Sequence, residues 1–144
     1  MTLDTQTSLI NYLWNLMTGN AALKAAMGGT VRCYLARAKP DAPFPYIVHR
    51  IDIAASDPFP MRQATYILDV WSESDNASEI LAIRTIILGL LDELIFTTDE
   101  VNSARLWIQA DSFVPEIEQD FYHYVMQWNL RYYGVAETAA ILDR

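Results

Sequence analysis

Cysteine is nearly absent from this sequence, because Cys33 is the single one among 144 residues. One thiol cannot form an intramolecular disulfide, and it cannot build a cysteine-rich zinc site. Proteins that fold around disulfides or around such a zinc site are therefore excluded, and a reducing compartment is the natural expectation. The length fits one domain, large enough to close a single core.

A secretory leader and a long uncharged apolar run are also missing. Residues Met1–Ser8 are polar and lack a basic start, and no small-residue cleavage site follows the first apolar stretch. The most apolar segment, Ile80–Phe96, carries Arg84, Asp92 and Glu93, so it is too short and too charged to span a bilayer. We therefore expect a soluble protein with no membrane partner.

Basic side chains are scarce, and the formal net charge is −8. Residues 1–62 hold six basic and four acidic side chains, whereas residues 63–144 hold four basic and fourteen acidic ones. Wrapping nucleic acid needs clustered Lys and Arg, so this balance argues against a nucleic-acid-binding protein. It is compatible with a surface past which DNA slides, with complementary patches on neighbouring subunits, and with charge that serves solubility alone.

Catalytic chemistry has little support in the sequence. His49 and His123 have no acidic or cysteine neighbour at metal-ligand spacing, and Cys33 has no evident histidine partner. Asp92 and Glu93 are adjacent on an expected helix and therefore do not face one site. No serine-nucleophile motif is present. We expect a protein that is not an enzyme and that carries no cofactor or metal.

Two further patterns have simpler explanations than ligand binding. The pair Gly28-Gly29 lacks the spacing of a phosphate-binding loop, and helix termination accounts for it. Glu116, Glu118 and Asp120 fall at an expected hairpin tip. They are able to bind a cation, but a solvated loop is the more economical interpretation.

The periodicity of apolar residues predicts an α+β domain. Helices are expected at about 7–17, 21–27 and 75–95, and strands at about 31–36, 46–53, 63–71, 105–113 and 121–133. Short turns between neighbouring strands predict a mostly antiparallel sheet of about five strands, with the long helix packed on one face and short N-terminal helices beside it. Residues 1–134 form this single domain, and residues 135–144 form a short C-terminal helix or a tail.

Helix caps and aromatic residues add detail to this prediction. Thr5, Thr7 or Ser8 is expected to cap the first helix, and Asn20 the second. The long helix is apolar nearly all round and needs two partners, the sheet and, as a candidate, a neighbouring subunit. Five aromatic side chains are interface anchors unless helices cover both faces of the sheet. They are Tyr46, Trp71, Trp107, Phe113 and Tyr133.

Several short motifs, taken in order, resemble a phage tail-completion family, the tail terminators or tail-to-head joining proteins. Pro43-Phe44-Pro45-Tyr46-Ile47-Val48 is similar to the family's P-x-P-Y-[IV]-V segment, and Asp69-Val70-Trp71 to its D-V-W-like strand end. A polar link, Ser74–Ala77, and an apolar helix follow. A strand with Val31-Arg32 precedes these motifs, and an acidic turn before an aromatic-rich strand completes the resemblance from about residue 8 to 133.

The resemblance implies a ring, usually hexameric, at the head-proximal end of a tail tube in the virion, built in the host cytoplasm. Such a ring stops tube polymerisation at the length set by a tape-measure protein and presents a surface to a head connector or stopper protein. DNA passes through its lumen without specific binding. The family has no catalytic residues to transfer, and residues 135–144 do not map onto it.

We expect subunit or partner contacts at charged residues, at one tryptophan and at the segment 54–61. The residues are Arg32, Arg37, Arg50, Arg62, Trp71, Glu116, Glu118 and Asp120. A head–tail neck or adaptor subunit and a tail-tube subunit are alternatives within the structural class. A dimeric α+β ligand-binding or enzymatic domain is the alternative of another class, with His49, His123 and Tyr124 as its candidate pocket residues.

Overall fold

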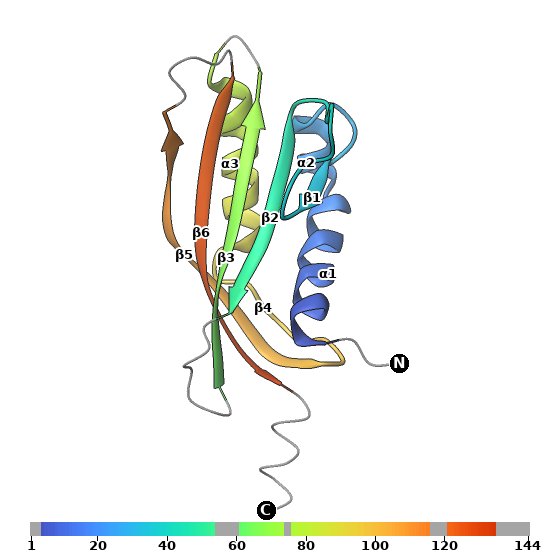
Figure 1. Ribbon diagram of the computed structural model, residues 1–144, viewed down its shortest axis with the longest axis vertical. Helices are drawn as coiled ribbons and strands as arrows, with labels where there is room; N and C mark the ends of the chain where they lie inside the picture. Colours follow the sequence, from blue (N-terminus) through green and yellow to red (C-terminus); the bar gives the residue numbers. More distant parts are fainter. Residues whose placement is uncertain (1–3, 54–60, 74–75, 116–120, 135–144) are drawn as a thin grey trace, which may run out of the picture.

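The computed structural model describes residues 4–53, 61–73, 76–115 and 121–134, which form a two-layer α+β domain (Figure 1). A six-stranded sheet has the order β1-β2-β3-β6-β5-β4, and three helices pack against one of its faces. In chain order the elements are α1 (Thr5–Thr18), α2 (Ala21–Ala26), β1 (Cys33–Leu35), β2 (Tyr46–Ile53), β3 (Met61–Ser72), α3 (Ser78–Leu91), β4 (Ile95–Phe96), β5 (Val101–Val114) and β6 (Tyr122–Gly134).

The sheet is mixed and has six strands, so the expected mostly antiparallel sheet of about five strands is matched only roughly. β1 runs parallel to β2, with Cys33 beside Ile47, and every other neighbouring pair is antiparallel. The additional strand is β4, in which Ile95 pairs with Arg105. A strand of two residues is too short to give an alternating pattern, so periodicity alone cannot predict it.

The first helix begins earlier than expected, because its N-cap is Asp4. The Asp4 carboxylate accepts a 2.7 Å hydrogen bond from the backbone N–H of Thr7, as an N-cap side chain does. Ser8 is instead buried and donates to Glu100 across the domain at 2.9 Å. Asn20 caps α2 as predicted, through the backbone N–H of Leu23.

Helix α3 is shorter than expected, because the chain leaves helical geometry directly after Leu91. Asp92 is extended (φ −68°, ψ 131°), and Glu93 has a φ of +62°, which an α-helix cannot accommodate. The buried residues of α3 pack on the sheet, and α2 packs beside it. Much of the apolar surface of α3 is therefore covered by its own chain, whereas Leu81 remains 41% exposed.

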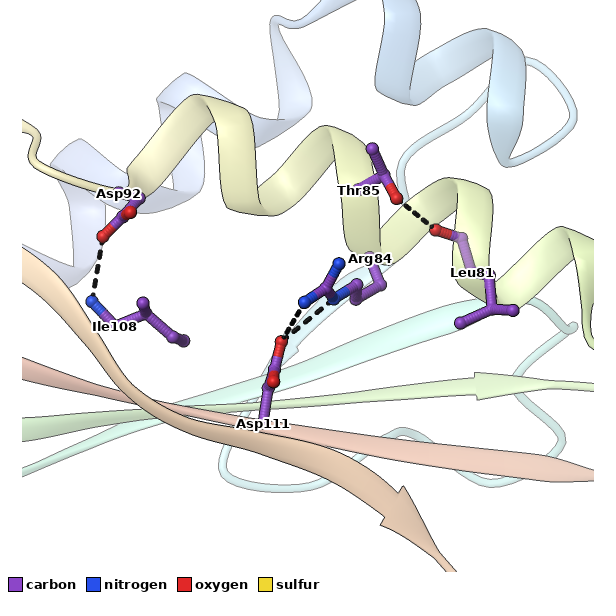
Figure 2. A network of polar contacts seen from close by, with 6 residues as sticks. All are labelled: Leu81, Arg84, Thr85, Asp92, Ile108 and Asp111. Carbon is purple, nitrogen blue, oxygen red and sulfur yellow. Dashed lines mark hydrogen bonds and ion pairs between the residues drawn. The ribbon is translucent and has the colours of Figure 1, made fainter.

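Two polar contacts join α3 and the residue after it to β5, the strand next to the edge strand β4 (Figure 2). Arg84 donates from Nε and Nη2 to one carboxylate oxygen of Asp111, at 2.9 and 2.6 Å. At the end of the helix, the Asp92 carboxylate accepts from the backbone N–H of Ile108 at 3.0 Å. The second contact gives the Ile108 N–H an acceptor. This N–H lies on β5 beyond Arg105, the last residue that pairs with β4.

The core lies between the helices and the helix-facing side chains of the sheet. Alternate residues of β2, β3 and β6 point into it, and Trp128 and Tyr66 are its largest fully buried side chains. His49 also lies there, 1% exposed, and its Nδ1 is 2.7 Å from the Tyr66 hydroxyl. The strand residues between the buried ones form the opposite face.

Candidate interaction surface on the open face of the sheet

The face of the sheet opposite the helices is left open by the helices and strands that the structure describes. On β2, Ile47, His49 and Ile51 are buried under the helices, so strand alternation places Val48 and Arg50 on the open face. Figure 1 shows α3 running along the sheet on the side away from this face. The open face is therefore a surface on which the described residues place no second layer.

An aromatic cluster occupies one end of the open face, where β2 and β6 begin and β3 ends. Trp71 is its centre and stacks on His123, with ring centroids 3.6 Å apart and planes at 11°. Tyr46 lies 6.1 Å from Trp71, and Phe121 lies 5.2 Å from it. The members of the aromatic cluster are Tyr34, Phe44, Tyr46, Trp71, Phe121 and His123.

His123 is held in the aromatic cluster by a carboxylate. Its Nε2 donates to Asp69 at 2.6 Å, and the two side chains are only 12% and 18% exposed. The strand register sets this contact, because Trp71 lies opposite His123 and Asp69 lies opposite Val125. The sequence analysis missed it, since Asp69 and His123 come together only when the register of β3 and β6 is known.

A cavity of about 340 Å³ opens beside the aromatic cluster. Arg37, Tyr46 and Val48 line one part of it, and Asp69, Trp71 and His123 line another, with Ala36 and Ala38. Stacking surfaces, one guanidinium and one histidine–carboxylate pair can bind a planar or charged group from a partner. The described residues of the lining include no serine, threonine or cysteine that the histidine could activate as a nucleophile.

The remaining reactive groups of the core are also unsuited to catalysis. Burial raises the pKa of the Cys33 thiol to about 12, so it stays protonated and inert at neutral pH. Burial lowers the pKa of His49 to about 4, so this imidazole is neutral and enclosed. Within the described ranges, no three His, Cys, Asp or Glu side chains are grouped to hold a metal ion.

Of the residues expected to make contacts, three lie on or beside the open face. Trp71 is the centre of the aromatic cluster, and Arg37 lines its cavity. Arg50 is exposed on β2 and lies 3.6 Å from the Asp52 carboxylate. Arg62, on β3, pairs in register with Tyr132 and is half-buried.

Arg32 and the acidic residues stand apart from this group. The Arg32 guanidinium donates to the carbonyl oxygens of Met27, Pro43, Phe44 and Pro45 at 3.0–3.1 Å, so it holds the proline-rich loop. Glu116, Glu118, Asp120 and residues 54–60, which were expected to make contacts, lie outside the described residues, as do residues 135–144, which were expected to form a short C-terminal helix or a tail.

Comparisons with known proteins agree with this architecture. The family described as "Tail completion protein gp17" matches residues 12–133. Among solved structures, a chain of the "Virion of native gene transfer agent (GTA) particle" has the same fold, with a TM-score of 0.71 and 17% identity, covering 91% of this chain and 96% of that one.

One further comparison and one property of the helices also bear on the chain. No curated protein matches the sequence. Within the described residues, no helix has the length and apolar character needed to cross a membrane. The family match spans most of the sequence and includes all six strands except the last residue of β6. The chain therefore belongs to the tail completion protein gp17 family.

Proposed function

We propose that this protein forms a closed ring at the head-proximal end of a phage tail tube, ends polymerisation of the tube there and joins the tail to the head connector. The observation that carries the proposal is membership of the tail completion family over residues 12–133. Members of this family are structural proteins of the phage virion and not enzymes. The inert Cys33 and the enclosed His49 agree with that class.

The fold supplies the two different surfaces that a head-to-tail ring requires. One is the open face with its aromatic cluster, and the other is the exposed side of α3, which carries Leu81. We propose a hexameric ring whose partners are further copies, the tail tube protein, the tape-measure protein and a head connector or stopper. DNA passes through the ring without specific binding, and assembly takes place in the host cytoplasm.

The contact residues of this ring are part of the proposal. Three residues are best placed for contacts with a neighbouring subunit, namely Trp71, Arg37 and Arg50. All lie on or beside the open face; Trp71 and Arg37 line its cavity, and Arg50 is exposed. Arg62, which strand alternation places on the helix-facing side at the start of β3, remains a proposed contact outside this set. Arg32 contributes through the proline-rich loop whose carbonyl groups it binds, and Glu116, Glu118 and Asp120 remain proposed contacts.

The test is tube growth in the presence of the purified protein. Tail tube protein is polymerised alone and with this protein, tube lengths and ends are scored in negative-stain images, and the mass of the protein is measured in solution. Rings at one end of arrested tubes support the proposal. Tubes made of this protein alone identify a tube subunit, and binding to a connector while tubes keep growing identifies a neck or adaptor subunit.

A dimer that binds a small ligand and leaves tube growth unchanged identifies the ligand-binding class instead. A monomer in solution is compatible with the proposal only if rings appear on the tubes. The tube images therefore decide the outcome in either case.

A further inference from the structure

A second and larger cavity, of about 740 Å³, lies on the open face at the end far from the aromatic cluster. It lies where β6 ends and β3 begins, since Met61 pairs with Tyr133 there. Glu93 and Ile95 line it from the connection after α3 and from β4. Arg105 and Trp107 line it from β5, and Arg131 and Tyr133 from β6.

Two arginines dominate this cavity. Arg105 and Arg131 lie directly opposite each other in the β5–β6 register, and like charges in that position destabilise a sheet unless an anion lies between them. The Arg131 guanidinium lies over the Trp107 ring, 5.3 Å from its centroid, which orients it in the lining. The cavity thus holds two positive charges at fixed positions.

Neither arginine forms an ion pair within the described parts of the chain. Arg84 and Arg50 each have a carboxylate partner, whereas neither Arg105 nor Arg131 forms an ion pair with a described residue. Glu93 is in the same lining and forms none either. In a protein of net charge −8, an exposed pair of arginines that forms no ion pair with a described residue is suited to bind an external anion.

We propose that Arg105 and Arg131 bind a carboxylate of an acidic segment from a second copy of this chain. Trp107, in the same lining, orients Arg131 for this contact. The proposal rests on the proposed ring, in which neighbouring copies meet. Guanidinium groups present planar pairs of N–H donors that match a carboxylate, and each such charge-assisted pair adds geometric specificity. A second copy is rich in the required ligand, because residues 63–144 hold fourteen acidic side chains.

The rest of the lining favours a protein segment over a DNA backbone. Ile95 is 62% exposed and Tyr133 is 37% exposed. Burying their apolar surface against apolar side chains lowers the free energy, and a peptide carries such side chains whereas a phosphate chain lacks them. The Glu93 carboxylate in the lining repels a polyanion but leaves room for a single carboxylate to reach the arginines.

The test compares two double variants with the same change in net charge. Arg105→Gln with Arg131→Gln removes the site, and Lys24→Gln with Lys39→Gln removes two exposed positive charges elsewhere. Self-association is measured by sedimentation equilibrium at low and high salt. We expect the arginine variant to raise the dissociation constant about tenfold or more, and the lysine variant about twofold at most.

Thermal melting separates this role from a folding role. Because the variant removes a repulsive cross-strand pair, the arginine variant should melt no lower than the wild type. The variant Arg105→Lys with Arg131→Lys keeps the charge and loses the planar donors, so its dissociation constant should fall between those of the wild type and the glutamine variant.

Three results overturn the inference: unchanged self-association of the arginine variant, a wild-type protein that stays monomeric at every concentration, or arginine-dependent binding of a short DNA duplex without any effect on self-association. The tube-growth experiment separates this inference from the proposed function. If wild type and arginine variant form rings and arrest tubes alike, the site is wrong and the function stands. If the wild type fails to arrest tubes, the proposed function itself fails.

Discussion

At the scale of single residues, Arg32 shows that an arginine chosen as a contact residue can have a structural task. Its guanidinium binds carbonyl oxygens of both the α2 end and the proline-rich loop, including those of Met27 and Phe44 at 3.1 Å. Because the planar donor group reaches several acceptors at once, lysine cannot replace it. The loop leads into β2, which begins at Tyr46 in the aromatic cluster.

We predict that Arg32→Lys lowers the free energy of unfolding by about 1–3 kcal/mol, because a single ammonium group cannot reach all four carbonyl oxygens and some of them lose their donor. Urea unfolding followed by circular dichroism measures it. Arg37→Lys is the matched control, since this exposed loop residue should change stability by about 0.5 kcal/mol or less. Equal effects of the two substitutions would show that the Arg32 contacts contribute nothing to folding.

His49 gives the protein a pH dependence whose sign follows from burial. The pKa of His49 falls from 6.5 to about 4 on folding, and Nε2 has no hydrogen-bond partner among the described residues. The unfolded chain therefore binds the proton first as the pH falls. The stabilisation is complete above the unfolded pKa and is lost progressively as the pH falls toward 4.

We predict a loss of about 2 kcal/mol in unfolding free energy between about pH 7.5 and about pH 5. Urea unfolding at a series of pH values measures this slope. His49→Gln should flatten it, whereas Tyr66→Phe should lower stability at every pH and keep the slope, since it leaves the histidine in place. A slope that survives in His49→Gln would assign the effect to other groups.

At the scale of elements, the sequence predicts those segments whose pattern is local. Strand β2 was predicted with its observed bounds, and Asn20 was predicted as the N-cap of α2. Both predictions succeed because strand alternation and helix capping depend on residues close together in the sequence. Strand β4 and the early end of α3 were missed. Both depend on the extended Asp92 and the positive φ of Glu93, and the apolar residues on either side of this pair do not reveal that break.

The candidate surface was less predictable than the elements. Trp71 and Tyr46 could be singled out as aromatic residues on strands, but their grouping with Phe121 and His123 is a product of the strand order. The cross-strand position of Arg105 and Arg131 likewise needs the register of β5 and β6, which includes shifts at irregularities. Register is a property of packing and turn geometry, so single-sequence patterns leave it open.

The attachment of α3 to β5 is an interaction between elements. Arg84 and Asp111 are 29% and 22% exposed, so their ion pair is partly shielded from water (Figure 2). We predict that Arg84→Met lowers the unfolding free energy by about 1–2 kcal/mol, because it leaves the Asp111 carboxylate without its partner. Arg50→Met removes an exposed ion pair and should cost about 0.5 kcal/mol or less. Urea unfolding of both variants and of Asp111→Asn measures the difference, and equal costs for the two methionine variants would contradict this reading.

At the scale of the whole molecule, the helical layer and the sheet have different roles. The helices bury one face of the sheet, and this leaves the other face free to carry aromatic residues and arginines that have no role in the core. A chain that carries a half-buried aromatic cluster on an open sheet face buries more apolar surface when an assembly covers that face. The ends of the open face differ in chemistry, with the aromatic cluster at one and the arginine pair at the other.

Assembly should therefore be more sensitive to substitutions on the open face than to substitutions on α1, and two tryptophans allow a matched comparison. Trp71 lies in the aromatic cluster, whereas Trp14 is 43% exposed on α1 and donates to the Cys33 carbonyl oxygen. We predict that Trp71→Ala reduces the fraction of capped tail tubes about tenfold or more, as loss of an aromatic interface anchor does. Trp14→Ala should leave capping within about twofold of the wild type.

Capping is scored in negative-stain images at equal protein concentration, and melting curves establish that both variants are folded at the assay temperature. Trp71 also stacks on His123 within its own subunit, so Trp71→Phe serves as a second variant that keeps a ring in the cluster. Partial recovery of capping by Trp71→Phe, at unchanged stability, assigns the effect to the surface. Equal loss of capping in Trp71→Ala and Trp14→Ala would instead assign it to stability, and the open face would then have no special part in the ring.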